Sequence, residues 1–123
     1  TISFTAGNKI LVTFNGNIGM DEAAQMGNIV LANSSGVIAG SIGAADGNRQ
    51  QATTSSRHYD TSSISPVCFT YLDTPSGTSE TYKVKIGSAN AGRTTYLNRS
   101  GSDENQGYRT RTASTLTLME IVV

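Results

Sequence analysis

The chain has 123 residues, of which 15% are charged, and nine basic residues balance nine acidic ones to a formal net charge of zero at pH 7. This length fits one domain with a single core, and zero net charge excludes the long-range attraction that draws basic proteins to nucleic acid or anionic lipid. The single cysteine excludes an intrachain disulfide and a multi-cysteine metal site, and no apolar run approaches the roughly 20 residues of a membrane-spanning helix.

Small polar residues dominate the composition, because Ser, Thr, Asn and Gly contribute 15, 16, 9 and 13 residues, or 53 of the 123. They favour turns and the solvent face of sheets, and they disfavour long helices. No signal peptide is visible, and the chain starts in the middle of an alternating pattern without an initiator Met. We therefore expect one all-β domain over residues 1–123, the C-terminal fragment of a longer protein.

Alternating or continuous apolar runs predict about eight short strands. They cover residues 2–4, 9–14, 28–32, 37–42, 64–72, 81–86, 94–100 and 113–123. Residues 57–60 are a further short candidate. Eight short strands with long loops are typical of a two-sheet antiparallel jelly roll or a closed sandwich.

The segments between these runs carry turn and loop signals. Asn15-Gly16 predicts a tight turn, because both residues tolerate positive φ. Residues 21–26 are the only candidate for a helical turn and fit a loop equally well. Residues 43–56 lack large apolar side chains, which predicts a loop or an edge segment. Asp73-Thr74-Pro75-Ser76-Gly77 predicts a turn.

The last strand is unusual because its end is apolar on both faces. One face carries Leu116, Leu118 and Val122, and the other carries Met119, Ile121 and Val123. One apolar face fits the core of the subunit, and the simplest cover for the second is another copy of the chain. We therefore expect Met119, Ile121 and Val123 at a subunit interface.

No catalytic or metal-binding set emerges from the sequence. A serine–histidine triad would need His58, the only histidine, with Asp60 two residues away, and no Gly-x-Ser-x-Gly motif accompanies it. We expect His58 at a surface or an interface, with a pH-sensitive contact as the alternative. The adjacent carboxylates Asp21-Glu22 and Asp103-Glu104 point to opposite faces of a strand, which does not suit a glycosidase pair. The Asp-x-Asp-x-Asp-Gly spacing of a calcium-binding loop is absent. Cys68 lies in the apolar run Val67-Cys68-Phe69, which predicts a buried structural thiol.

The loop over residues 100–111 is the strongest candidate for a ligand site. Arginines and tyrosines gather in and beside it, and this pairing can bind sugars or anions through bidentate hydrogen bonds and ring stacking. The predicted ligand-binding residues are Arg99, Asp103, Tyr108, Arg109 and Arg111. The alternative is an ordinary solvated loop or a trimer-contact loop. Acidic residues in the loop and zero net charge oppose nucleic-acid binding.

Three segments of the C-terminal half resemble the C-terminal part of structural proteins from tailed bacteriophages and large algal viruses. They are Tyr71–Val84, Tyr96–Ser100 and Thr112–Ile121, and they contain the motifs D-T-P…T-Y-K-V, Y-L-N-R-S and S-T-L-T-L-M-E-I. The resemblance covers about residues 62–121, half of the chain. Val122-Val123 extends beyond the pattern.

The resemblance implies a jelly-roll domain similar in fold to tumour necrosis factor. Such a domain would trimerise at the tip of a virion fibre or spike. It implies a non-enzymatic domain without a cofactor, located on the virion and attached to a host-surface glycan or protein. The alternatives are a purely structural trimerisation or capsid-decoration module, and a carbohydrate-active enzyme, which the lack of paired acids disfavours.

Overall fold

The computed structural model describes all 123 residues, and its regular structure is almost entirely β. Ten strands follow one another along the chain, with one 3-10 turn, η1, at Ala39–Ser41. The strands are β1 Ile2–Ser3, β2 Lys9–Met20, β3 Gln25–Asn33, β4 Gly36–Val37, β5 Thr54–His58, β6 Ser65–Asp73, β7 Ser79–Glu80, β8 Lys83–Ser88, β9 Thr95–Leu97 and β10 Thr115–Ile121. The all-β prediction is therefore confirmed.

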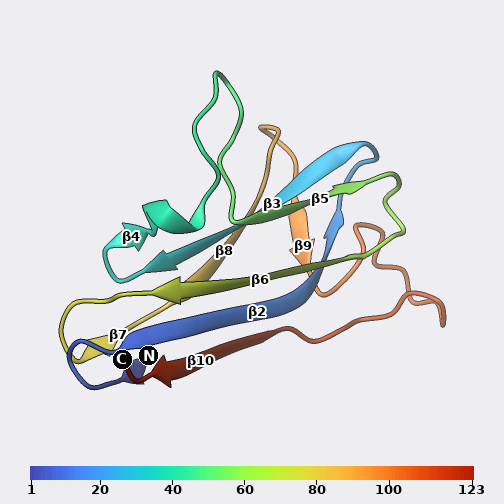
Figure 1. Ribbon diagram of the computed structural model, residues 1–123. Coiled ribbons are helices and arrows are strands. Elements are labelled where there is room, and N and C mark those ends of the chain that lie inside the picture. The colour runs from blue at the N-terminus through green and yellow to red at the C-terminus, as the bar shows by residue number, and fades with distance from the viewer.

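Two antiparallel sheets form the body of the molecule (Figure 1). In the first, here the β2 sheet, β2 lies between β10 and β6, and β9 pairs with the far end of β2. In the second, here the β3 sheet, β3 lies between β8 and β5. The short strand β4 pairs with the C-terminal end of β3, on the same side as β5. The short pair β1–β7 lies apart from both sheets in the hydrogen-bond pattern.

The core lies between the two sheets. One cluster joins Ile10 and Val12 of β2 to Leu31 of β3, together with Phe4 and Tyr82. A second cluster joins Phe14 and Ile18 of β2 to Ile29 of β3 and Val67 of β6. Both clusters contain side chains from both sheets, so the sheets bury their inner faces against each other.

The long strand β2 corrects the prediction of a turn at Asn15-Gly16. The residues on its inner face are buried along the whole strand, from Ile10 to Met20. Gly16 keeps this alternation and makes room for a neighbouring ring, because a Cβ there would lie 2.7 Å from Cζ of Phe14. The period-2 burial of β2 therefore overrides the local turn preference of Asn15-Gly16.

The connections around β3 also differ from the prediction. Of the two alternatives predicted for residues 21–26, the structure has the loop: the chain turns at residues 21–24, where Ala24 has φ 60°, and β3 begins at Gln25. The runs predicted as strands over residues 28–32 and 37–42 meet in a hairpin, in which Asn33 pairs directly with Gly36, but the second strand, β4, ends at Val37. The remaining residues of that predicted strand form η1 and its flanks.

Cys68 and His58 lie in the opposite environments to those predicted. Cys68 is exposed, because Val67 and Phe69 point inward and the residue between them must point outward. His58 is fully buried at the end of β5, opposite Gln25 of β3, and neither ring nitrogen has a hydrogen-bond partner. Burial lowers the pKa of His58, and the nearby charge of Asp60 opposes this effect in part.

Candidate functional site

The predicted ligand loop connects β9 to β10 and is closed at its base by backbone hydrogen bonds. Asn98, which has φ 62°, donates its N–H to the carbonyl of Asn17 at 2.7 Å. Its own carbonyl accepts a 3.0 Å hydrogen bond from the N–H of Thr112, on the returning side of the loop. The loop therefore starts and ends beside β2.

Two glycines allow the loop to lie directly against the end of β2. A Cβ on Gly101 would overlap the carbonyl oxygen of Met20, and a Cβ on Gly19 would overlap that of Arg99. Ser100 is buried at this contact, and its hydroxyl donates to the carbonyl of Ser102 at 2.7 Å. These contacts fix the backbone from which the arginine and aspartate side chains project.

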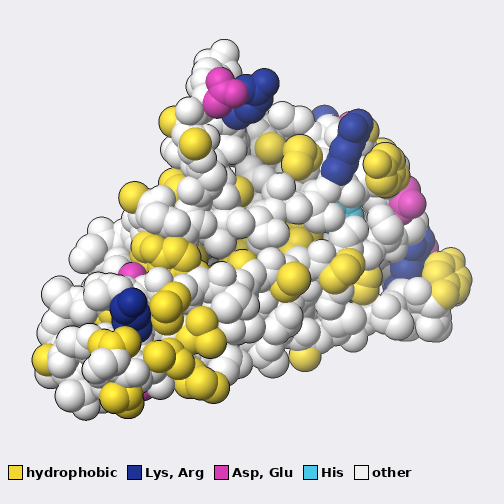
Figure 2. Space-filling model, viewed as in Figure 1, with side chains coloured by type: hydrophobic (Ala, Val, Ile, Leu, Met, Phe, Trp, Pro, Cys, Tyr) yellow, Lys and Arg dark blue, Asp and Glu magenta, His cyan; other side chains and the backbone are white.

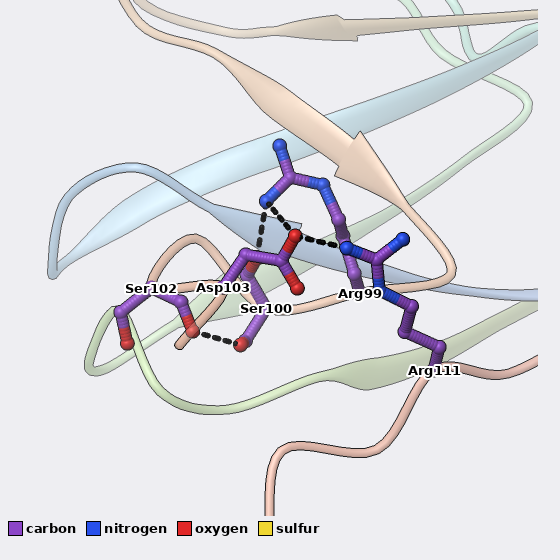
Figure 3. Close-up of polar contacts among 5 residues, drawn as sticks. All are labelled: Arg99, Ser100, Ser102, Asp103 and Arg111. Atoms are coloured by element: carbon purple, nitrogen blue, oxygen red, sulfur yellow. Dashed lines mark hydrogen bonds and ion pairs between the residues drawn. The ribbon is translucent and has the colours of Figure 1, made fainter. Parts of the chain in front are cut away.

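Asp103 joins two of the predicted arginines (Figure 3). One carboxylate oxygen of Asp103 pairs with Arg111 and lies 3.5 Å from Nη1 of Arg99. The same Arg99 nitrogen donates to the carbonyl of Ser100 at 3.3 Å. The guanidinium carbon of Arg99 also lies 3.8 Å from the ring centroid of Tyr96, which is cation–π geometry.

Arg109 and Tyr108 are neighbours in the loop that differ in exposure. The Arg109 side chain is only 13% exposed and lies 3.7 Å from Glu104, and its Nε is buried without a partner. Tyr108 is 70% exposed, and the guanidinium carbon of Arg109 lies 5.0 Å from its ring centroid. The Tyr108 ring is therefore open to contact from outside.

A cavity of about 510 Å³ lies within this loop. It is lined by Asp103, Glu104, Asn105, Gln106, Arg109 and Arg111. Three of the five predicted ligand residues thus line one cavity, Arg99 joins them through Asp103, and Tyr108 does not line it. The arginines of the loop already pair with its carboxylates, so a ligand here would share or displace those ion pairs.

The second candidate surface is the outer face of the β2 sheet. Leu11 of β2 lies opposite Met119 of β10 on one side and Leu72 of β6 on the other. Met119 is 53% exposed and Leu72 45%. A row of threonines follows, with Thr13 between Thr117 and Thr70. Ile121 is half-buried, and Val123 is exposed beyond the end of β10.

Figure 2 shows hydrophobic side chains gathered toward the lower left, over the end of the sheet where β6 and β10 finish. The alternation of the last strand identified Met119, but no pattern in the sequence identified Leu11 or Leu72. They share a face with Met119 only through the strand register, which follows from pairing of Leu11 with residues 61 and 108 positions further along the chain. Among the described side chains, no group of three or more His, Cys, Asp or Glu could hold a metal ion.

No helix of the structure has the length and apolar character needed to cross a membrane. Comparisons with protein-family models, with curated proteins and with solved structures return no match to this chain.

Proposed function

We propose that this chain is the jelly-roll head domain of a virion fibre or spike, which forms a homotrimer and attaches the particle to a host-surface glycan or protein. The observation that carries the proposal is the apolar row of Leu11, Met119 and Leu72 on the outer face of the β2 sheet, in which Met119 and Leu72 are exposed and Leu11 is half-buried between them. Contiguous apolar side chains on the outside of a small domain mark an interaction surface.

The order of the strands supports a jelly roll. The chain crosses from β2 in one sheet to β3, β4 and β5 in the other, returns to β6, crosses to β8 and returns to β9 and β10. Repeated crossing between two antiparallel sheets is expected of a jelly roll, as of other Greek-key sandwiches, and not of two stacked meanders. The sequence resemblance of the C-terminal half to viral structural proteins is independent of this observation.

We assign the apolar row to contact with other copies of the chain. The row and the threonines beside it carry no charge, and the nearest charged side chain on that face is Lys9, opposite Ile121. An uncharged surface of this kind can meet its own copies without bringing like charges together. Three copies would present three copies of the 99–111 loop, which is the predicted loop over residues 100–111 together with Arg99. Weak single-site binding would then be strengthened by avidity.

Two measurements test the proposal separately. Multi-angle light scattering should give the mass of a trimer, and labelled protein should bind intact host cells. Substitution of Arg109 and Arg111 by Ala should reduce cell binding and leave the trimer intact. A trimer that binds no cells would favour the purely structural trimerisation or capsid-decoration module.

A further inference from the structure

A lobe formed by residues 43–53 rises beside the outer face of the β3 sheet (Figure 1). Between the lobe and the sheet lies a cavity of about 640 Å³, the largest in the molecule. Its polar lining is mostly amides and hydroxyls: Asn28, Asn48, Gln50, Gln51, Asn90, Thr53, Thr54 and Ser55. Arg49 is its only charged lining residue, and Arg49 pairs with Asp46.

Hydrogen bonds hold the lobe in place at its base. Gly43 donates its N–H to the carbonyl of Ala52 at 3.1 Å, and the Gln51 side chain donates to the carbonyl of Gly43 at 2.6 Å. Thr53 donates its N–H to the carbonyl of Ile29 at 2.9 Å, which ties the end of the lobe to β3. The cavity wall is therefore formed before any ligand arrives, and this lowers the entropy cost of binding.

The amides of the cavity orient one another across three segments of chain. Nδ2 of Asn28 donates to Oε1 of Gln50 at 2.9 Å, and Nε2 of Gln50 donates to the carbonyl of Ala89 at 2.7 Å. Asn90 donates to Gln25 at the start of β3. Each primary amide has two N–H donors and two acceptor positions, so Asn28 and Gln50 keep donors and acceptors free for a ligand.

A second cavity of about 200 Å³ continues the first across the sheet. The two share Asn28, Gln50 and Gln51, and the second adds Lys85 at the β8 side. No carboxylate lines either cavity. The second cavity also has an apolar lining of Val30, Val37 and Ile86. The result is an extended groove with uncharged hydrogen-bonding groups along its length, and with apolar side chains and a single unpaired cation toward β8.

We propose that this groove binds an uncharged oligosaccharide. Sugar hydroxyls donate and accept at once, and side-chain amides and hydroxyls match that pattern. A strongly anionic ligand would call for several free cations, and a peptide would call for deep pockets for apolar anchor side chains. The apolar lining of the larger cavity consists instead of Met26, Ala44, Ala52 and Ala89, which form shallow contacts suited to sugar C–H groups.

The test uses isothermal titration of the purified protein with mannotetraose, maltotetraose and chitotetraose, and with a heparin tetrasaccharide as the acidic probe. At least one neutral probe should bind saturably. Asn28→Ala/Gln50→Ala should weaken that binding at least tenfold, since it removes two hydrogen-bonding groups. Ala44→Trp, at an exposed position on the cavity wall, should block binding without altering β3.

The matched control is Asn15→Ala, which removes an exposed amide from β2, outside both this groove and the cavity of the 99–111 loop, and should leave neutral binding unchanged. The proposal is overturned if no neutral probe binds, or if the groove variants bind as the parent does. It is also overturned if only the acidic probe binds and Arg109→Ala/Arg111→Ala abolishes that binding. Because the groove and the apolar row lie on different sheets, none of these outcomes decides whether the chain trimerises.

Discussion

Met119 lies directly opposite Leu11 in the antiparallel pairing of β10 with β2, and both side chains point away from the core. Directly opposed residues on one face of an antiparallel pair are the closest neighbours in a sheet. The two side chains therefore form one surface, and a charge placed at either position would affect the whole row.

We predict that Met119→Lys dissociates the proposed trimer and leaves the fold intact. A lysine at this position would place three ammonium groups in the apolar contact, where each would be buried without a partner. The far-UV spectrum should not change, because position 119 faces outward from an edge strand. The matched control is Val37→Lys, a 46% exposed apolar residue that pairs with β3, and it should leave the mass unchanged.

We predict that Gly101→Ala disturbs the 99–111 loop through its backbone. The added methyl group would overlap the carbonyl of Met20, so the segment that holds Ser100 must move away from β2. A forced backbone shift of this kind costs about 1–3 kcal/mol of unfolding free energy, measured by denaturant titration. Gly107→Ala is the control in the same loop, since a Cβ there would have no other atom within 4 Å, and it should change stability by less than about 0.5 kcal/mol.

We predict that Asp103→Ala loosens the loop with little effect on global stability. The substitution removes the pairing with both Arg99 and Arg111. Exposed ion pairs contribute about 0.2–1 kcal/mol each, so the midpoint of thermal unfolding should fall only slightly. Cleavage by trypsin after Arg109 and Arg111 should become several-fold faster.

Asp46→Ala is the control for this experiment, because it removes one exposed ion pair, with Arg49, at the far lobe. It should leave trypsin cleavage in the 99–111 loop at the parent rate. Equal cleavage rates in Asp103→Ala and the parent would mean that Asp103 does not hold the loop.

We predict that His58 makes the protein less stable as the pH falls below neutrality. Its folded-state pKa lies below the ordinary 6.5, so the unfolded chain takes up a proton that the folded chain resists. Above pH 6.5 His58 is neutral in both states, and the free energy of unfolding has its full value. As the pH falls from 6.5 toward the folded pKa, the free energy of unfolding decreases by at most about 1.4 kcal/mol per pH unit. Denaturant titrations at pH 7.5, 6.0 and 5.0 should show this slope.

His58→Leu should remove most of the slope between pH 6.5 and 5.0 and should retain or raise the stability at pH 7.5, because the buried ring nitrogens have no partners to lose. The carboxylates with lowered pKa values, Asp60, Glu80 and Glu120, titrate below their ordinary 3.8 to 4.5 and so outside this window. An unchanged slope in His58→Leu would assign the acid sensitivity to other groups.

Much of the strand content could be predicted from local patterns. The run over 64–72 became β6 and the last run became β10, because each contains enough alternating or continuous apolar residues to define a buried face. The same period also determines that Cys68 points outward between Val67 and Phe69, so its exposure could be predicted from the sequence. The apolarity of the triplet obscured that signal.

Other features depend on contacts that no local pattern records. His58 is buried because β5 pairs with β3, although the residues before it in β5 are Thr, Ser and Arg. The groove combines Asn28 of β3 with Gln50 and Ala89, which are distant in sequence, and residues 43–56 alone predict only a polar loop. The grouping of Asp103 with Arg99 and Arg111 could be predicted from the sequence, because all three residues lie within one loop.

The mass of the purified chain in solution, measured by multi-angle light scattering at micromolar concentration, tests most directly whether the Leu11–Met119–Leu72 row joins copies of the protein. The proposed assembly predicts three times the mass of the chain for the parent and a single mass for Met119→Lys. A parent that remains a monomer, or a Met119→Lys variant with the mass of a trimer, would contradict it.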